Sequence, residues 1–192
     1  MMATYSDQRK RIHPHKFTMW VALGSIVMMF AGLTSAYVVK RNQSNWLEFD
    51  LPIVFWYSTA AILASSLSIY LAGQAFNARE MRRYRLLMSV TVVLGLVFTA
   101  LQLVGFSHIG ENGIKLIGTN SNPAASFLAV LTGVHILHVL GGVVALVIMY
   151  IRAYTAKQKT YSSISLEIVS TYWHFVDVLW IYLFIFFHVV QV

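Results

Sequence analysis

Five long apolar runs constrain this chain more than any other feature. Four of them contain no charged residue and the fifth contains one, Asp177. About 20 apolar residues in a helix cross the ~30 Å hydrocarbon core of a bilayer. The first run is longer than the apolar region of a signal peptide, so we expect it to be retained as a helix. The runs cover residues 17–39, 51–76, 86–106, 124–151 and 168–192.

The sequence therefore predicts an all-α integral membrane protein whose fold is a bundle of five transmembrane helices. Residues 1–16 form a polar, basic segment, and residues 17–192 form a single membrane domain. The composition supports this class, because 58% of the residues are hydrophobic and only 11% are charged. Soluble domains carry about 25% charged residues. The chain has no cysteine, which excludes disulfides and thiolate metal sites.

The basic residues indicate how the chain is oriented. If the N-terminus is cytoplasmic, the inner segments 1–16, 77–85 and 152–167 hold eleven Lys and Arg, and the outer segments hold three. By the positive-inside rule, this asymmetry predicts a cytoplasmic N-terminus and a periplasmic C-terminus. The net charge of +7 comes from these short segments and not from one basic face, so nucleic acid is not expected as a partner.

Small and aromatic residues predict where helices meet each other and the membrane surface. Small residues let helix backbones approach closely in lipid. They recur in the second span at Ala60, Ala64, Ser68 and Ala72, and in the fourth at Gly133, Gly141 and Ala145. Aromatic residues near span ends are typical of interfacial belts. They are Trp20, Tyr37, Trp46, Trp56, Tyr57, Tyr150, Tyr154 and Trp173.

Ionisable side chains inside the last two spans are the candidate site. His135 and His138 lie in the fourth span, and His174 and Asp177 lie in the fifth. Residues three apart on a helix point roughly the same way. A carboxylate inside a transmembrane helix costs at least ~2.5 kcal/mol, so Asp177 needs a partner. We expect the four side chains to form one hydrogen-bonded cluster in the inner half of the bundle.

Four interpretations of this cluster remain open from the residues alone. Imidazole and carboxylate at this spacing can bind a catalytic metal ion. Opposed histidines can ligate haem, and a chain of ionisable groups can mark a proton or ion pathway. The remaining interpretation is a structural polar clamp that holds two helices in register. Glu167 needs no metal to explain it, because it lies near the positive end of the last helix dipole.

Two motifs resemble a known family. Residues 172–180 read YWHFVDVLW and residues 132–142 read TGVHILHVLGG, which closely resemble subunit III of haem-copper terminal oxidases, including cytochrome c oxidase. Glu167, five residues before the first motif, and residues 25–32 (SIVMMFAG) are also similar to the family pattern. The resemblance extends over almost the whole chain after residue 12.

The resemblance implies an accessory subunit that has no catalytic centre of its own. Haem and copper are then expected in the partner catalytic subunit I and not in this chain, which binds phospholipid and helps sustain proton uptake. The expected partners are subunit I, the other oxidase subunits and phospholipids, in a bacterial inner membrane. The candidate residues are expected to form a structural polar cluster or lipid contacts: His135, His138, Glu167, Trp173, His174 and Asp177.

The chain also departs from the family pattern. Many members have seven spans, whereas five are predicted here. The family's intramembrane acidic residue corresponds to Ile26, so a role for that carboxylate does not carry over. The alternatives are subunit III of a quinol oxidase and a stand-alone membrane metalloenzyme that uses the His/Asp cluster. A small transporter or channel is disfavoured, because the first three spans contain no ionisable residue.

Overall fold

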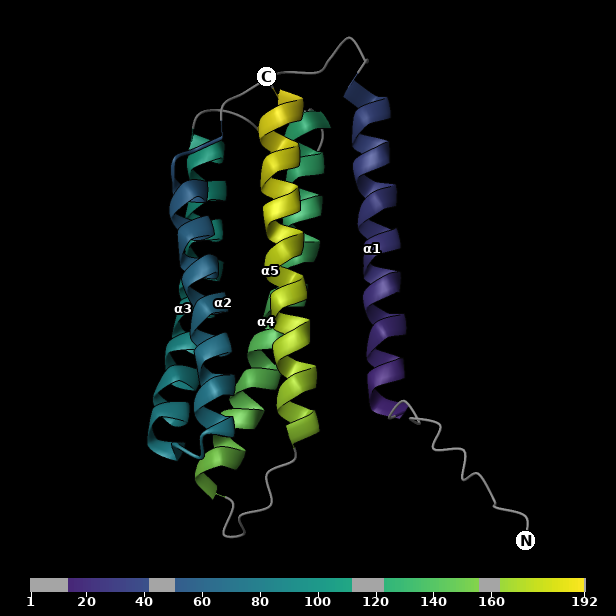
Figure 1. Ribbon diagram of the computed structural model, residues 1–192. Helices are drawn as coiled ribbons and strands as arrows, with labels where there is room; N and C mark the ends of the chain where they lie inside the picture. Colours follow the sequence, from purple (N-terminus) through teal and green to yellow (C-terminus); the bar gives the residue numbers. More distant parts are fainter. Residues whose placement is uncertain (1–13, 42–50, 112–122, 156–162, 192) are drawn as a thin grey trace, which may run out of the picture.

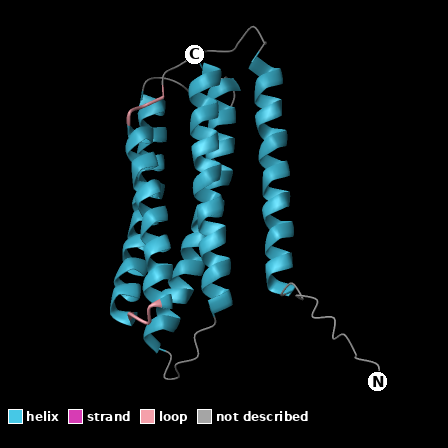
Figure 2. Ribbon diagram, in the orientation of Figure 1, coloured by secondary structure: helices cyan, strands magenta, loops and turns pink. Residues whose placement is uncertain are grey.

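The computed structural model describes residues 14–41, 51–111, 123–155 and 163–191, and these parts are almost entirely helical (Figure 2). All five helices are long and apolar enough to cross a membrane. The shortest has 24 residues, a length of roughly 36 Å at ~1.5 Å per residue. The predicted all-α fold with five transmembrane helices is confirmed. The helices are α1 (Pro14–Arg41), α2 (Val54–Asn77), α3 (Met81–Glu111), α4 (Pro123–Thr155) and α5 (Ser163–Gln191).

The helices extend beyond the apolar runs at most ends. Helix α3, for example, begins at Met81 and includes Arg82, Arg83 and Arg85 before the uncharged run starts. Long basic side chains at a helix end can reach the headgroup region while their stems stay apolar, so charge does not end a helix there. Most of the predicted basic N-terminal segment, residues 1–13, lies outside the described residues, as does the predicted belt residue Trp46.

Helices α4 and α5 form the middle of the bundle (Figure 1). The hairpin of α2 and α3 packs on them from one side, and α1 packs on them from the other. The first turn of α1, the α2–α3 turn, the end of α4 and the start of α5 lie at the same end of the molecule (Figure 1). The described parts of the three basic segments therefore meet at one end, as the charge pattern requires.

A Schellman motif closes the turn between α2 and α3. The backbone N–H of Glu80 donates to the Ala75 carbonyl over 2.9 Å, and that of Arg79 donates to the Phe76 carbonyl over 3.1 Å. Arg79 takes the left-handed conformation that this motif requires, with φ of 60°. These bonds satisfy carbonyls that the helix end would otherwise leave free, and the chain reverses within three residues.

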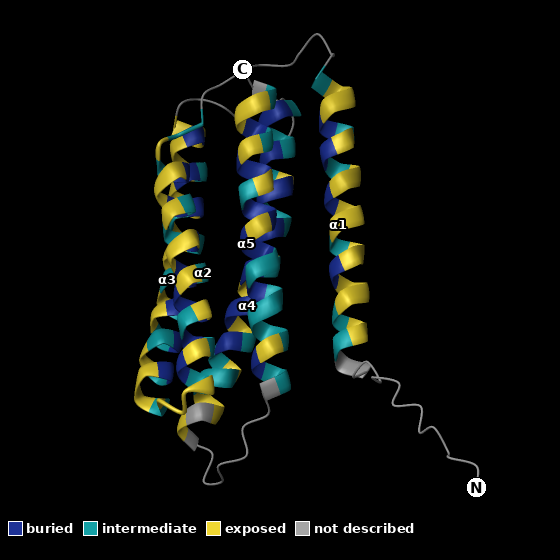
Figure 3. Ribbon diagram, viewed as in Figure 1, coloured by how far each residue is buried: buried dark blue, intermediate teal, exposed yellow. Residues whose placement is uncertain are grey.

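Large aromatic rings pack among aliphatic side chains in the core, and the outside is apolar. Phe30, Phe98, Trp173 and Trp180 are buried between the helices. The outward faces of all five helices are exposed (Figure 3), and many of the exposed residues are large and apolar. In water such a surface would be unstable, but in a bilayer it contacts lipid tails. Since lipid is as apolar as these side chains, packing and hydrogen bonds between helices must hold the bundle together.

Candidate functional site

Helix α2 supplies hydroxyl groups to which α5 is hydrogen-bonded. The indole Nε1 of Trp173 donates to Ser65 Oγ over 3.0 Å, and that of Trp180 donates to Thr59 Oγ1 over 2.9 Å. The two tryptophans are seven residues apart, about two helical turns, so both indoles lie on the same side of α5. No water is available within lipid to replace these partners. The two bonds therefore fix the register of α5 against α2.

Further hydroxyl groups join α2 to α3. Gln102 Nε2 donates to Ser58 Oγ over 2.9 Å, and Ser68 Oγ donates to the Leu87 carbonyl over 3.0 Å. Ser58 and Gln102 are fully buried. Helix α2 contains no Asp, Glu, Lys, Arg or His, so its polar contacts with α3 and α5 are made by neutral groups.

His135 lies in an aromatic cage. Its ring stacks on Trp180 with 5.4 Å between centroids and 29° between planes. Phe30 and Phe98 meet the imidazole edge-on at 6.4 Å and 5.9 Å. Within the described part of the chain, neither ring nitrogen has a hydrogen-bond partner. The imidazole therefore packs as an aromatic ring that belongs to the core of the bundle.

His138 is hydrogen-bonded within its own helix. Its Nδ1 lies 2.7 Å from the Val134 carbonyl, to which a protonated Nδ1 donates. The His138 carbonyl in turn accepts a hydrogen bond from the Tyr172 hydroxyl over 3.0 Å. The second contact joins α4 to α5. The His138 backbone therefore contacts α5, and its imidazole meets the Phe30 ring of α1 edge-on, with 5.9 Å between centroids.

His174 and Asp177 both face α2. Ser66 Oγ lies 2.7 Å from His174 Nδ1, and both residues are partly buried. Asp177 is 2% exposed. Ser66 is the polar side chain within reach of its carboxyl, but the hydroxyl is bonded to His174 instead. Among the described residues, both Asp177 oxygens consequently lack a hydrogen-bond partner.

Glu167 forms an ion pair that joins α5 to α1. Its Oε1 lies 2.7 Å from Lys16 Nζ, and the side chains are 59% and 33% exposed respectively. Exposed ion pairs are typically worth 0–1 kcal/mol. Glu167 also lies near the start of α5, where the helix dipole favours a negative charge. The pair therefore positions α1 more than it stabilises the bundle.

The expected single cluster of His135, His138, His174 and Asp177 is wrong in its hydrogen bonding. The two histidines of α4 contact an aromatic cage and their own helix, whereas His174 and Asp177 are directed to Ser66. Searched across the described residues, the chain shows no group of three His, Cys, Asp or Glu side chains placed to hold a metal ion. The spacing of three residues places each pair on one side of its helix, but the α4 pair and the α5 pair have different partners.

Trp173 was expected at the membrane interface, and this expectation is wrong. The side chain is 1% exposed. Its ring packs on two glycines, because a Cβ at Gly95 or Gly142 would lie 2.8 Å or 2.9 Å from ring atoms. Tyr37 is likewise buried, whereas Trp20 and Trp56 are exposed as a belt residue should be. Trp173 is therefore the side chain around which α3, α4 and α5 approach each other.

The hydroxyl residues of α2 are members of the site that were not predicted. A signal was present: Ser58 and Ser65 are seven residues apart, as are Thr59 and Ser66. Seven residues are about two helical turns, so each pair lies on one stripe of the helix. Hydroxyl groups repeated in this way in an apolar span are typical of interhelical hydrogen bonds.

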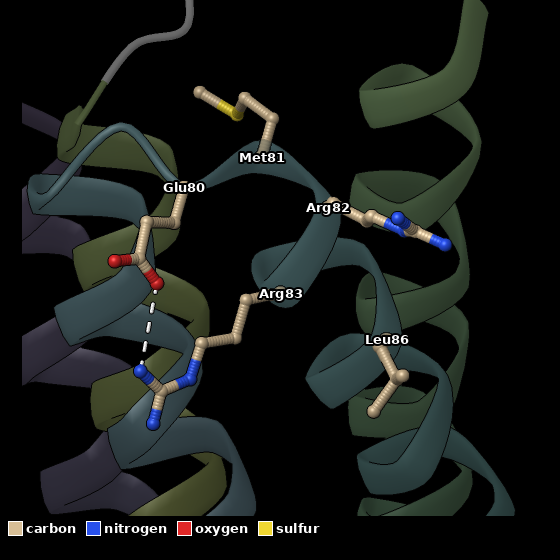
Figure 4. A pocket seen from close by; sticks show the side chains of 5 residues that line it. All are labelled: Glu80, Met81, Arg82, Arg83 and Leu86. Atoms are coloured by element: carbon tan, nitrogen blue, oxygen red, sulfur yellow. Dashed lines mark hydrogen bonds and ion pairs between the residues drawn. The ribbon is translucent and has the colours of Figure 1, made fainter.

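The turn between α2 and α3 and the first turn of α3 carry four arginines: Arg79, Arg82, Arg83 and Arg85. Figure 4 shows a pocket at this turn, lined by Glu80, Met81, Arg82, Arg83 and Leu86. Arg83 Nη1 lies 3.5 Å from Glu80 Oε2, a long and exposed ion pair. Arg85 instead lies over the Tyr154 ring, 4.6 Å from its centroid. These arginines fit the predicted cytoplasmic end of the bundle.

A second pocket lies where α2 ends and α5 begins. Its volume is about 300 Å³. Hydroxyl, amide and carboxylate groups line it beside apolar side chains. The lining residues are Gly73, Phe76, Asn77, Leu166, Glu167, Ser170 and Thr171. It lies one helical turn from His174 along α5.

Comparison with known proteins gives matches along nearly the whole chain. A family model described as cytochrome c oxidase subunit III matches residues 45–191. A probable cytochrome c oxidase subunit 3 from Nocardia farcinica is 31% identical over 191 residues, covering 91% of this chain and 90% of that protein. The cytochrome c oxidase subunit 3 of Bacillus sp. (strain PS3) is 29% identical, covering 86% of this chain and 80% of that protein.

Quinol oxidase subunits match at a similar level. A probable quinol oxidase subunit 3 from Staphylococcus saprophyticus is 29% identical over 176 residues, covering 88% of this chain and 86% of that protein. The range that the family model matches, residues 45–191, contains α2 to α5. It therefore includes every interhelical hydrogen bond of α2 described above.

Proposed function

The chain belongs to the cytochrome c oxidase subunit III family, and from this we propose that it is the accessory, non-redox subunit III of a respiratory cytochrome c oxidase. It is a subunit III of a haem-copper oxidase, one chain of a multi-subunit terminal oxidase complex. It is integral to the bacterial inner membrane. In the proposed role it supports assembly, binds phospholipid and sustains proton uptake while the catalytic subunit I reduces oxygen to water.

The hydrogen bonds of the candidate residues support an accessory role. Trp173 and His174 contact hydroxyls of α2, and the His138 backbone contacts Tyr172. Each bond joins two helices of this chain or holds a side chain against its own backbone. Residues engaged in this way stabilise a scaffold. The stand-alone metalloenzyme would need three or more such side chains to converge on one point, and the described residues show no such group.

We place haem and copper in the partner subunit. His135 has the burial that a haem ligand would have, but its ring is packed among Trp180, Phe30 and Phe98. His138 lies three residues along the same helix, so it cannot oppose His135 as a second axial ligand. The described donors therefore do not fit a haem between these helices.

Proton uptake through the first helix is not part of the proposal. Ile26 occupies the position of the family's acidic residue and packs partly buried against the core. An isoleucine neither binds nor transfers a proton. Any support of proton uptake must come from other groups or from the way the bundle holds lipid and the catalytic subunit.

The electron donor separates the leading proposal from its alternative. Relatives of both kinds match this chain with closely similar identity. We favour cytochrome c as the donor, and a quinol is the alternative. Purified complex that oxidises reduced cytochrome c supports the first. Oxidation of a quinol alone would replace it with the second.

Affinity purification through this chain in mild detergent tests the proposal. We expect larger chains, haem absorption and copper to co-purify, and all haem and copper to be lost when this chain is separated from them. Complex stripped of this chain is expected to begin turnover at a similar rate and to lose activity sooner. Stoichiometric metal retained by the isolated chain would contradict an accessory role, and so would purification without any haem protein.

A further inference from the structure

Asp177 is an acidic side chain within a transmembrane helix that lacks a partner for its charge. It is 2% exposed, and no described residue hydrogen-bonds to either of its oxygens. An ionised carboxylate in this setting costs at least ~2.5 kcal/mol, even on lenient insertion scales. Taking up a proton removes the charge and with it most of this cost. The carboxyl therefore gains by binding a proton, provided that a proton can reach it.

Ser66 connects this carboxyl to an imidazole. Its side chain faces Asp177, and its Oγ lies 2.7 Å from His174 Nδ1. His174 and Asp177 are three residues apart on α5, so both are directed to the same side. A hydroxyl donates one hydrogen bond and accepts two. Ser66 can therefore accept a hydrogen bond from the imidazole while it donates one to the carboxyl.

The route continues from His174 to the pocket between α2 and α5. Ser170, His174 and Asp177 are spaced by four and three residues, so they lie along one stripe of α5. Ser170 lines the pocket together with Asn77 and Glu167, and the pocket has room for several water molecules at about 300 Å³. His174 is only partly buried. One helical turn thus separates the pocket from the first group of the relay.

We propose that Asp177 is a proton-binding site and that it exchanges protons with water in this pocket through His174 and Ser66. In one transfer, His174 Nε2 takes a proton from hydronium, Nδ1 passes its proton to Ser66 Oγ, and Ser66 passes its own to the Asp177 carboxylate. Three bonds to hydrogen form, three break, and hydronium becomes water. The reverse sequence releases the proton.

The elements around Asp177 contribute few other charges. Helix α2 has no Asp, Glu, Lys, Arg or His, and its two tyrosines, Tyr57 and Tyr70, are exposed. The membrane-spanning part of α3 has no titratable residue between Leu86 and Ser107. On α4, His135 is enclosed by aromatic rings and His138 is bonded to its own helix. Lys16 of α1 is paired with Glu167 at the pocket end of the route. His174 is thus the titratable group placed to exchange protons with Asp177.

The inference goes beyond the proposed function, because it assigns a titrating group to this chain whatever its partners do. Infrared spectroscopy of the full chain in lipid vesicles tests it, since a protonated carboxyl has a carbonyl band that a carboxylate lacks. We expect this band at neutral pH in the wild type and its loss in Asp177→Asn. Replacing water with D2O shifts the band at the rate at which the proton exchanges.

Two variants of equal shape test the relay. Ser66→Val removes the hydroxyl and is expected to slow the shift by about tenfold or more, which corresponds to ~1.4 kcal/mol in the barrier. Ser66→Thr keeps a hydroxyl and should exchange at the wild-type rate. Ser25→Ala is the control, because Ser25 is exposed and its hydroxyl bonds the Val21 carbonyl of its own helix.

Two results would overturn the inference. If Asp177→Asn removes no carbonyl band, Asp177 does not bind a proton. If Ser66→Val and Ser66→Thr exchange equally fast, the proton takes another route. Should both Ser66 variants fail to fold, His174→Gln decides: a slowed shift supports the relay, and a wild-type rate refutes it. None of these results bears on membership of an oxidase complex, so the two proposals fail separately.

Discussion

Ser65 is the residue on which two helix contacts depend at once. It accepts the hydrogen bond of the Trp173 indole over 3.0 Å, and its hydroxyl is directed to the Thr91 carbonyl at 3.4 Å. Ser65→Ala leaves a buried N–H unpaired, which costs about 1–3 kcal/mol. We expect a lower midpoint of thermal unfolding in detergent. Ser25→Ala should leave the midpoint unchanged. Equal midpoints for both variants would mean that the hydrogen bonds of Ser65 do not stabilise the bundle.

Arg79 offers the opposite test, a change that stabilises. Its φ of 60° is left-handed, a conformation that costs about 1–2 kcal/mol for a residue with a Cβ and little for glycine. Arg79→Gly is therefore expected to raise the free energy of unfolding by about 1 kcal/mol. Arg79→Ala removes the same charge but keeps the Cβ, so it should bring no gain. A gain in both variants would mean that charge, and not backbone strain, is responsible.

The burial of Asp177 could be predicted from the sequence, but the partners of the candidate residues could not. Asp177 lies within an apolar run, so its burial followed from its position. A spacing of three residues defines a side of the helix only to within tens of degrees. The His135 ring therefore stacks on Trp180, and His174 lies within hydrogen-bond distance of the Ser66 hydroxyl on α2. The direction of a side chain depends on neighbours that are distant in sequence.

At the scale of helices, Gly142 controls how closely α4 and α5 approach. A Cβ at this position would lie 2.9 Å from ring atoms of Trp173. The indole is rigid and buried, so Gly142→Ala must push the helices apart, at a cost of about 1–3 kcal/mol. We expect a lower unfolding midpoint and less haem co-purified through this chain.

The same helix provides the matched control for Gly142. At Gly133 a Cβ would meet nothing within 4 Å among the described residues. Gly133→Ala should therefore stabilise α4 slightly or leave it unchanged, because alanine favours the helix by up to ~1 kcal/mol. If Gly133→Ala were as damaging as Gly142→Ala, helix propensity and not close packing would explain both.

The number and class of the helices followed from the lengths of the apolar runs, because crossing lipid leaves few alternatives. Which faces meet did not follow. Ala60 and Ala64 of the predicted small stripe are exposed, whereas Ser68 and Ala72 of the same stripe are buried. A stripe of small residues permits close packing, but large rings decide where it happens. The Trp173 ring packs on Gly142, which is the neighbour of the predicted Gly141.

At the scale of the whole molecule, the prediction that remains is its orientation in the membrane. The described parts of the basic segments lie at one end of the bundle (Figure 1). The direction of insertion is set by the membrane potential and the translocation machinery acting on these charges. The excess of eleven Lys and Arg over three is what predicts that this end faces the cytoplasm.

Single cysteines test the orientation without background, because the chain contains none. Arg82 and Glu111 are exposed and lie near opposite ends of α3. In cells whose cytoplasmic membrane is intact and whose outer layers let the reagent through, a membrane-impermeant maleimide should label Glu111→Cys. It should label Arg82→Cys only after the membrane is opened, since that end is predicted to face the cytoplasm. The opposite pattern would place the N-terminus outside, and with it the pocket from which Asp177 is proposed to exchange protons.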